Sequence, residues 1–584
     1  MIAYVPPLDD VRFALAHMAG LEQLARLPGC AAVTPDLVDQ VLEEAGKFAA
    51  NELAPLNATG DREGARLENG VVRTPRGYRE AYWKFVEGGW HGLPFPEKWG
   101  GQGLPWSVAM PVWEMWHSAN FAFCLCPILT QAGVELLLHH GTEEQRARYL
   151  PKLVSGEWTG TMCLTEPHAG SDVGALKTRA VREGDHYRIR GTKIFITFGE
   201  HDYTENTIHM VLARTPDAPP GTRGISLFLI PKFLLNADGS PGPRNEVRCV
   251  SLEEKLGIHA SPTCVMSFGD DAGAIGYLVG EEQGGMRAMF TMMNNARLQV
   301  GLEGLAIAER AYQAALAYAR ERVQGRRRDG GEERPARIVE HPDVRRMLMT
   351  MKTQVEAMRA LAYTAAGALD RAEREPDAAA RAAAERRLAL LTPLVKAWCT
   401  DVGFEITSTA LQVHGGMGYI EETGIAQMLR DARIAMIYEG TSGIQALDLV
   451  GRKLTMAEGR LPAELFEELR QDLRALDAAG EMALHRTLGS ALTTLEDATS
   501  WLQARHDNDP DAAAAGATPY LRLFATTLGG FLLARSALAA RGTELGESKR
   551  ASAGFFVGQL LPPATALLPA ITAGSAPLSL EVFA

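Results

Sequence analysis

The residue pattern changes its period twice along this 584-residue chain, and this change constrains the fold more than any other feature. Up to about residue 160, and again from 285 onwards, apolar residues recur with the three-to-four-residue spacing of amphipathic helices. Between them lie short alternating segments such as "HYRIRGTKIFIT" and "ISLFLIPK", separated by Gly, Pro, Asp and Asn. The sequence therefore predicts a mainly α protein with a central β domain, built as a small barrel or sandwich.

The same changes of pattern give the predicted domain boundaries. They are an N-terminal helical domain (1–160), a middle β domain (161–282), a helical bundle (283–458) and an additional helical domain (459–584).

Four long helical patterns predict the bundle. The first begins near 285, and the others lie near 341–371, 377–414 and 421–455. In the following helix-rich stretch, the alanine-rich segment 504–519 reads as a linker or a solvated helix end. Near the N-terminus, Thr34 is a predicted helix N-cap.

Composition narrows the class of protein. The net charge of -12 argues against wholesale binding to nucleic acid or to an anionic membrane. Seven scattered cysteines show no disulfide framework and no metal-ligand spacing, so we expect a reducing, cytoplasmic environment and no metal site. The start "MIAYVPPLDDVRF" lacks the features of a secretory signal. Runs such as "LGGFLLARSALAA" are interrupted well before membrane length, so we expect no membrane segment.

Two polar motifs fall in the β region. "TMCLTEPHAGSDVGALKT" (161–178) offers the hydroxyls of Thr165 and Ser171, which suit an anionic or heteroaromatic ligand. By composition alone, a Gly/Ser loop with a side-chain turn is the more frequent explanation. In "GTKIFITFGE", Phe195 and Thr197 fall on one side of a strand and could pack on a flavin, although a half-buried strand is commoner.

Two further segments have both a purely structural and a functional explanation. "LQVHGGMGY" (411–419) fits a helix ending at a glycine pair, and His414 within it is either a base or a structural histidine. The basic run 326–328 is either a solvated loop or an attractor for an anionic substrate. No lysine-bearing phosphate loop and no GxGxxG after a strand occur, so nicotinamide and nucleoside-triphosphatase functions lack support.

"AMIYEGTSGIQALD" (435–448) places Glu439 between a tyrosine and Gly-Thr-Ser-Gly, directly before a helical pattern. An acid at a helix N-terminus stabilises the helix dipole by less than about 1 kcal/mol. The residue types alone therefore leave open whether Glu439 does more.

Taken together and in this order, "CLTEPHAGSD", "LQVHGGMGY" and "IYEGTSGIQ" resemble the acyl-CoA dehydrogenase family over residues 35–455. The remaining tail resembles the subgroup with an added C-terminal domain, which includes 3-methylmercaptopropionyl-CoA dehydrogenases. The resemblance implies a helical N-terminal domain, a β-barrel middle domain and a four-helix bundle, followed by a helical extension. It also implies FAD as cofactor and an acyl-CoA as substrate, as in fatty acid β-oxidation.

By this resemblance, Glu439 removes the α-proton of the thioester and FAD N5 receives the β-hydride, giving a trans-2-enoyl-CoA. Fixed donors on the thioester carbonyl and a dry site would make such a weakly acidic proton removable. Some relatives carry the base on the first bundle helix, where this chain has Ala296. The base is therefore assigned to Glu439.

The resemblance assigns the binding roles residue by residue. The residues expected to contact FAD are Met162, Leu164, Thr165, Ser171, Phe195, Thr197, Arg322, Gln412, Gly416 and Thr441. The residues expected to contact the acyl-CoA are Ser171, Asn294, Arg297, Tyr438 and Gly440. Three of the FAD contacts, Arg322, Gln412 and Gly416, would reach the cofactor of a neighbouring subunit.

Several positions depart from the family pattern, and the family's RxxFG is here RVQG at residues 322–325. Phe195 stands where tryptophan is usual, Asn294 where Asp is frequent, and Gly443 where Gln is frequent. We expect a homodimer, because the C-terminal helices would cover the surface through which shorter relatives form tetramers, and an electron-transfer flavoprotein as electron acceptor. The alternatives are an acyl-CoA oxidase that uses O2 and a catalytically silent acyl-CoA-binding scaffold. The acyl chain length is not readable.

Overall fold

The computed structural model describes residues 4–329 and 332–583, which form two compact units. The first unit consists of Met1–Lys47, Pro105–Ser118 and Arg297–Ala584. The second unit consists of Phe48–Leu104 and Ala119–Ala296. Both units are therefore assembled from segments that lie far apart in the sequence.

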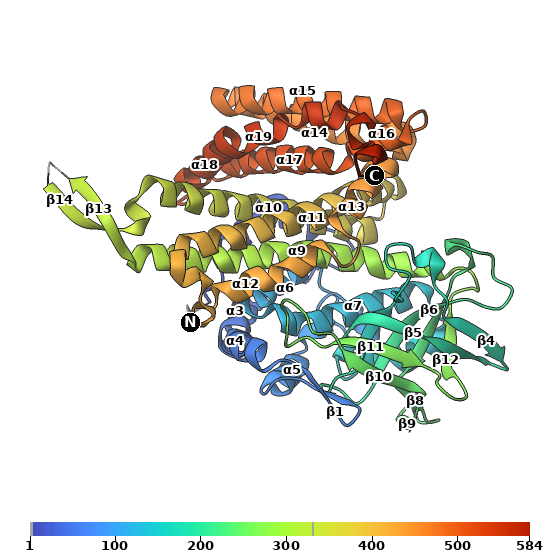
Figure 1. Cartoon of the computed structure of the whole chain (residues 1–584). Coiled ribbons are helices and arrows are strands. Elements are labelled where there is room, and N and C mark those ends of the chain that lie inside the picture. The colour runs from blue at the N-terminus through green and yellow to red at the C-terminus, as the bar shows by residue number, and fades with distance from the viewer. Residues whose placement is uncertain (1–3, 330–331, 584) are drawn as a thin grey trace. The chain divides into compact units, whose positions relative to one another are not determined.

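An eight-stranded sheet is the centre of the second unit (Figure 1). Its strands are β3 (Thr159–Cys163), β4 (Arg179–Glu183), β5 (His186–Thr197), β6 (Thr207–Ala213), β7 (Ser226–Pro231), β10 (Val247–Leu252), β11 (Thr263–Phe268) and β12 (Ala274–Val279). The order is β10-β11-β5-β12-β7-β6-β3, with β4 on β5. Thr161 Oγ1 on the edge strand β3 donates to the Thr197 carbonyl on β5 at 2.7 Å, so this edge turns back towards the middle of the sheet. The predicted central β region is confirmed.

Helices and small ladders complete the second unit. The helices are α4 (Ala54–Glu63), α5 (Tyr78–Glu87), α7 (Phe121–His140) and α8 (Glu143–Ser155), and the ladders are β1 (Arg66–Glu68) with β2 (Val71–Arg73) and β8 (Phe233–Leu235) with β9 (Pro241–Arg244). Asn120 caps α7 by accepting from Phe123 N at 3.1 Å, and Thr142 and Gln145 form a capping box on α8.

Three long helices form the bundle of the first unit: α9 (Gly285–Glu321), α10 (Pro342–Arg374) and α11 (Ala378–His414). The prediction of a fourth long helix near 421–455 is wrong. The chain instead makes α12 (Ile425–Ala432), a 3-10 turn (Arg433–Met436) and α13 (Ser442–Gly451). Two consecutive residues between them, Glu439 and Gly440, have positive φ, which no right-handed helix accommodates.

Glycines set the spacing between α9 and α11. A Cβ at Gly304 would lie 2.4 Å from the Cys399 carbonyl oxygen, and one at Gly403 would lie 2.4 Å from the Gly304 carbonyl oxygen. Because these obstacles are backbone atoms, the two helices approach at a distance that only glycine permits. This contact fixes the position of neighbouring side chains on both helices.

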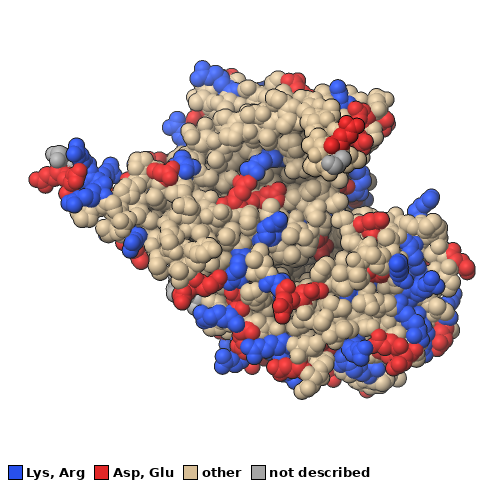
Figure 2. Space-filling view, in the orientation of Figure 1, with Lys and Arg blue, Asp and Glu red and all other residues tan. Residues whose placement is uncertain are grey.

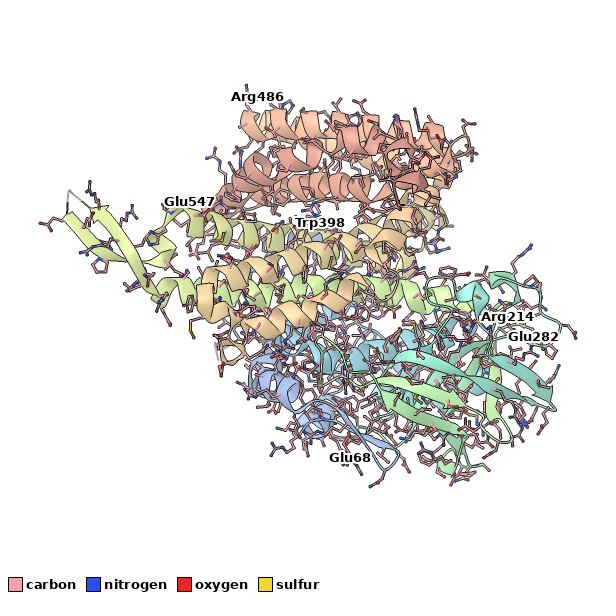
Figure 3. The ribbon with its side chains drawn as sticks, viewed as in Figure 1. Glu68, Arg214, Glu282, Trp398, Arg486 and Glu547 are labelled. Atoms are coloured by element: carbon pink, nitrogen blue, oxygen red, sulfur yellow. The ribbon has the colours of Figure 1, made fainter. Side chains whose placement is uncertain are left out.

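The C-terminal helices pack on the bundle within the first unit. They are α14 (Leu461–Ala478), α15 (Met482–Arg505), α16 (Pro510–Ala515), α17 (Ala517–Ala539), α18 (Gly546–Phe555), α19 (Leu561–Thr565) and α20 (Leu568–Thr572). Trp398 lies between α11 and α17, where its ring contacts the position of Gly529 (Figure 3). Arg522 on α17 makes a two-point ion pair with Glu405 on α11, at 2.6 and 3.0 Å.

The alanine-rich segment 504–519 contains α16, which corrects the expectation of a linker. Ala512 and Ala513 are buried, and Asp509 caps this helix by accepting from Ala512 N at 3.1 Å. Alanine serves here as a small packing residue.

The N-terminal segment spans the bundle and the C-terminal helices of the first unit. It contains α1 (Leu8–Ala14), a π-helical turn (Leu15–Ala19), α2 (Leu21–Leu24) and α3 (Pro35–Phe48). Gln313 on α9 donates to the Val5 carbonyl at 2.8 Å, and Lys549 on α18 pairs with Asp10 on α1 at 2.5 Å. The N-cap expected at Thr34 is confirmed by its 3.2 Å bond from Leu37 N.

A two-stranded hairpin, β13 (Val323–Asp329) with β14 (Glu332–Arg337), extends away from the bundle helices (Figure 1). The basic run 326–328 is thus a strand, whereas a loop was expected, although its exposure is confirmed. Basic and acidic side chains gather on this hairpin (Figure 2), and Arg326 and Arg328 both face Glu333, at 3.6 and 3.5 Å. Such exposed pairs contribute at most about 1 kcal/mol each.

Among the described residues, three stretches are long and apolar enough to cross a membrane by length and composition alone: Phe121–His140, Ala517–Ala539 and Gly546–Thr572. This corrects the expectation that every apolar run is broken short of membrane length. The first two windows are 89% and 83% buried in the protein, and the third is 28% buried. In the third stretch the large residues Phe556 and Leu561 are buried, and much of the exposed face is Gly, Ala and Pro.

All seven cysteines lie within the described ranges, where each is buried and none forms a disulfide. In the same ranges, no group of three or more His, Cys, Asp or Glu side chains is placed to hold a metal ion.

Candidate active site

A strained turn presents Glu439. Its φ is +54°, in the left-handed region, and the next residue, Gly440, has φ +88°. A left-handed conformation costs a residue with a Cβ roughly 1–2 kcal/mol. The φ of Gly440 is one that residues with a Cβ rarely adopt, so this position favours glycine, and a Cβ there would also displace Gln445 Nε2, 2.6 Å away. Backbone strain of this kind persists only where the surroundings impose it.

Three neighbouring elements hold this turn. On one side Tyr438 Oη donates to Glu303 Oε2 on α9. On another, Ser442 Oγ donates to Asp401 Oδ1 on α11 at 2.7 Å. Gln445 on α13 donates to the Glu439 carbonyl at 3.4 Å. Tyr438 and Gly440, both expected at the substrate site, are therefore parts of the structure that positions Glu439.

Thr441 caps α13 by accepting from Ile444 N at 3.1 Å. Helix α13 thus begins three residues after Glu439, with the N–H groups and the positive dipole end of its first turn nearby.

The surroundings of Glu439 raise the pKa of its carboxyl. Desolvation raises the pKa of its partly enclosed carboxyl, while the positive charges of Arg297 and Lys396 act in the opposite direction. Arg297 is itself buried, and burial lowers its pKa, offset by Asp448 and Glu439. The structure thus brings two predicted site residues, Arg297 and Glu439, into electrostatic contact.

Two further residues named in the sequence analysis, Asn294 and Ala296, lie on α9. Ala296 is buried and offers no base, and Asn294 is exposed two residues earlier on the same helix.

The second unit gathers six of the residues expected at the flavin. Met162 is buried on β3, and Leu164 and Thr165 follow that strand directly. Ile194 N donates to the Thr165 carbonyl at 3.0 Å, which joins this loop to β5 beside Phe195. Phe195 has φ +60° and its side chain is 59% exposed, so the kinked strand end presents an aromatic face.

This arrangement fits a flavin. Around Phe195, the hydroxyls of Thr165, Ser171 and Thr197 have no hydrogen-bond partner among the residues that the structure describes. An open aromatic face beside unused hydroxyls suits a polar heteroaromatic ring. Beneath the loop, Lys193 donates to the Leu164 carbonyl at 2.9 Å and pairs with Glu166 at 2.8 Å.

Three residues expected at a neighbouring subunit's FAD lie together at one end of the bundle. Tyr318 on α9 stacks on His414 on α11, with ring centroids 4.4 Å apart. Arg322 follows Tyr318 by one turn and bonds to Gln324 at 3.2 Å, and Gln412 and Gly416 flank His414 and are exposed. His414 is buried and its Nδ1 donates to the Ala410 carbonyl at 2.8 Å, which supports the structural alternative for this histidine.

Sequence reasoning missed four residues around Glu439. They are Glu303, Lys396, Asp401 and Gln445. A signal existed for two of them. Glu303 is a lone acid in the apolar run "VGLEGLAIA", and Lys396 is a lone base in "LLTPLVKAWC". A single charge inside such a run is a candidate for burial with a partner.

With this fold and site, the chain belongs to the acyl-CoA dehydrogenase family. The family models for the N-terminal, middle and C-terminal domains of acyl-CoA dehydrogenase match residues 36–157, 161–270 and 283–454. A model described as "Acetyl-CoA dehydrogenase C-terminal like" matches 465–580. The resemblance inferred from the motifs and the fold class are both confirmed.

Similar proteins include full-length relatives. The chain is 47% identical over 571 residues to a 3-methylmercaptopropionyl-CoA dehydrogenase of Ruegeria pomeroyi, covering 96% of each chain. It is 34% identical to a butyryl-CoA dehydrogenase of Syntrophomonas wolfei, covering 95% of this chain and 93% of the relative. The fold matches an acyl-CoA dehydrogenase complexed with FAD from Bacillus anthracis, with a TM-score of 0.74 and 21% identity, covering 92% of this chain and 88% of the other.

FAD is the cofactor of this family, and its members are oxidoreductases that act on acyl-CoA. The cofactor expected from the sequence is therefore confirmed at the level of the family.

Proposed function

We propose that this chain converts an acyl-CoA thioester into its trans-2-enoyl-CoA, with Glu439 as the base that removes the α-proton. The turn at residues 438–442 carries the proposal. It is strained, held from three sides, and it presents a carboxyl whose pKa is raised by desolvation. General bases work best when their pKa lies near the working pH, and burial is the usual way to raise a glutamate.

The chain's own residues supply the proton transfer. Glu439 accepts the α-proton as its ionised carboxylate, so activity rises with pH through its pKa. Because the turn is anchored by Tyr438, Ser442 and Gln445, the carboxylate needs little reorganisation before it reacts. Free N–H groups at the start of α13 suit the developing negative charge on the thioester oxygen. FAD, for which Phe195 and its neighbouring hydroxyls provide the fitting surface, supplies the acceptor for the β-hydride.

For the substrate, we propose a short acyl-CoA, with 3-methylmercaptopropionyl-CoA tested first. The relative at 47% identity carries that name, and the relative at 34% identity is named for butyryl-CoA. We also propose an electron-transfer flavoprotein as the electron acceptor, a homodimer and a cytoplasmic location.

The test is anaerobic flavin reduction. The purified protein, loaded with FAD, is mixed with 3-methylmercaptopropionyl-CoA, butyryl-CoA or palmitoyl-CoA, and loss of the oxidised-flavin absorbance is followed. We expect Glu439→Gln to keep FAD and to lose about 10²- to 10⁴-fold in the rate of reduction. Glu458→Gln is the matched control, since Glu458 is also a glutamate with positive φ, at 58°.

Near-normal reduction by Glu439→Gln would refute the assignment of the base. If no acyl-CoA reduces the flavin, the chain is a silent binder, and rapid reoxidation by O2 would indicate an oxidase.

A further inference from the structure

An acidic and a basic side chain are buried beside the turn, and neither takes part in the proton transfer proposed above. Glu303 on α9 and Lys396 on α11 are both 0% exposed. Burying an ammonium without compensating charge costs several kcal/mol, so a buried lysine calls for opposite charges nearby. The question is which charge Lys396 compensates.

Close helix packing places the two residues at the same level of the bundle. A Cβ at Gly301 would lie 2.5 Å from Val395 Cγ1 and 2.7 Å from the Val395 carbonyl oxygen. Gly301 precedes Glu303 by two residues, and Val395 directly precedes Lys396. With the Gly304–Cys399 contact one turn further along, α9 and α11 hold both side chains in their interface.

Hydrogen bonding distinguishes Lys396 from Glu303. Glu303 accepts from Tyr438 Oη through Oε2. Lys396 Nζ is buried and has no hydrogen-bond partner within residues 4–329 and 332–583. Buried polar groups without a partner are rare in native proteins, so each one needs an explanation. Its positive charge is instead compensated by acidic groups that act without a hydrogen bond to Nζ.

The charged groups that act on Lys396 come from α9, from α11 itself and from the turn that carries Glu439. Glu439, Asp401 and Glu303 favour its charged form in that order, and Arg297 opposes it. Burial raises the pKa of Glu303 to about 8, so this acid is neutral at neutral pH. Burial also raises the pKa of Asp401, against the bond from the Ser442 hydroxyl. This order makes Glu439 the leading counter-charge.

Lys396 is charged over the range in which the base must work. Burial lowers its pKa to about 8, so the ammonium persists below that pH. Of the two cations that face Glu439, Arg297 is shared with Asp448 and is opposed by Arg452. Burial is the main cause that opposes the charged form of Lys396, and Arg297 is the charged group that opposes it.

We propose that Lys396 is a positioning residue whose buried ammonium holds Glu439 in its carboxylate form and so fixes the lower end of the enzyme's pH range. In this arrangement Glu303 acts as a neutral acid that anchors Tyr438 and the turn. The proposal rests on Glu439 being the base, and it adds the group that keeps that base ionised inside a desolvated site.

The test isolates proton removal from hydride transfer. (Methylthio)acetyl-CoA has sulfur at the β-position, so it has α-hydrogens but cannot lose a β-hydride. In D2O buffer the FAD-loaded enzyme should exchange these α-hydrogens for deuterium, which mass spectrometry measures as a function of pH. Glu439→Gln should abolish the exchange. Absence of exchange in the unmodified enzyme, or its persistence in Glu439→Gln, would refute the proposed base independently of Lys396.

Lys396→Met removes the charge and keeps the length of the side chain. We expect the acid limb of the exchange profile to move up by about one pH unit, because an opposite charge at close range lowers a carboxyl pKa by about 1–3 units. At pH values below the limb, this shift corresponds to a tenfold loss of exchange. Lys396→Gln should show the same shift. At pH values well above the acid limb, the variants should exchange at nearly the rate of the unmodified enzyme. A merely structural role of Lys396 would instead lower the rate of exchange at every pH.

Two controls sharpen the result. Lys453→Met removes another buried lysine of the same unit. Because Asp448, Arg452 and Arg297 are the charged groups that act on Lys453, the acid limb of this variant should not move. Glu303→Gln keeps the bond to Tyr438 and should also leave the acid limb unmoved if Glu303 is neutral. An unchanged acid limb in both Lys396 variants, a limb displaced equally by Lys453→Met, or loss of folded, flavin-loaded protein in both Lys396 variants would overturn the proposal.

Discussion

Replacement of Arg359 by methionine tests whether a buried ion network holds the first unit together. Arg359 on α10 is 2% exposed and lies between two carboxylates. It donates to Glu114 from Nε and Nη2 at 2.9 and 2.6 Å, and to Glu309 from Nη2 at 2.7 Å. Tyr363 donates to the other oxygen of Glu114 at 2.7 Å. The network therefore joins α6 (Trp106–Ala119), α9 and α10.

The size of the effect follows from what the variant leaves behind. Without Arg359, two carboxylates stay buried beside each other with no cation, and breaking a buried pair in this way costs about 3–5 kcal/mol. The first unit has roughly 350 residues, so its unfolding entropy is about 0.7 kcal/mol/K if it unfolds cooperatively. The expected fall in Tm is therefore about 4–7 °C.

The deficit should also depend on pH. Burial already raises the pKa of Glu114, and loss of Arg359, which opposes this, raises it further. A carboxyl with a raised pKa in the folded state destabilises the fold as pH rises from its ordinary value through the raised one. The stability lost by Arg359→Met should thus be larger near about pH 8 than near about pH 5.

Differential scanning calorimetry at both pH values measures these shifts. The double variant Glu114→Gln/Arg359→Met removes one of the stranded charges and should recover part of the loss. A Tm unchanged at both pH values, or a double variant less stable than Arg359→Met, would refute the reasoning.

Two further predictions concern the C-terminal helices and the flavin surface. A chain ending at Glu458 exposes the apolar face around Trp398 and should aggregate, whereas a chain ending at Ala573 should remain a soluble dimer by light scattering; a soluble, unchanged dimer from the shorter chain would contradict this. Phe195→Ala should weaken FAD binding about 2- to 12-fold without lowering Tm, because the ring is exposed and stacking contributes about 0.5–1.5 kcal/mol. Fluorescence titration of FAD measures the loss, Val250→Ala is an exposed control in the same unit, and equal affinity in both variants would disprove the role of Phe195.

The sequence predicted the fold where a single period runs through an element. The helices α9, α10 and α11 and the alternating strands follow from apolar spacing, which reports directly on burial. It failed near 421–455, because spacing does not reveal backbone dihedrals, and the positive φ of Glu439 interrupts an otherwise helical pattern. It also failed at 510–515, because alanine is compatible with both solvent and close packing.

The site was only partly predictable for a related reason. Glu439 stands in a motif, and its Gly440 neighbour signals a special turn. Lys396 and Glu303 lie far apart in sequence, and only the close approach of α9 and α11 brings them together. Each is a single charge in an apolar run, which suggests burial, but the sequence does not show which group each one faces.

The contact between Asp10 and Lys549 has a consequence for how the protein is made. The second unit ends at Ala296, so all of its segments have been synthesised before half of the first unit exists. Helix α1, by contrast, emerges first and must wait for Lys549 to complete its docking surface. At about 5–20 residues per second, roughly 30 to 110 seconds of translation separate the two. The buried side of α1, with Val11 and Leu15 of the next turn, also packs on α10, so it stays uncovered until α10 has been made, which makes it a natural site for a ribosome-associated chaperone.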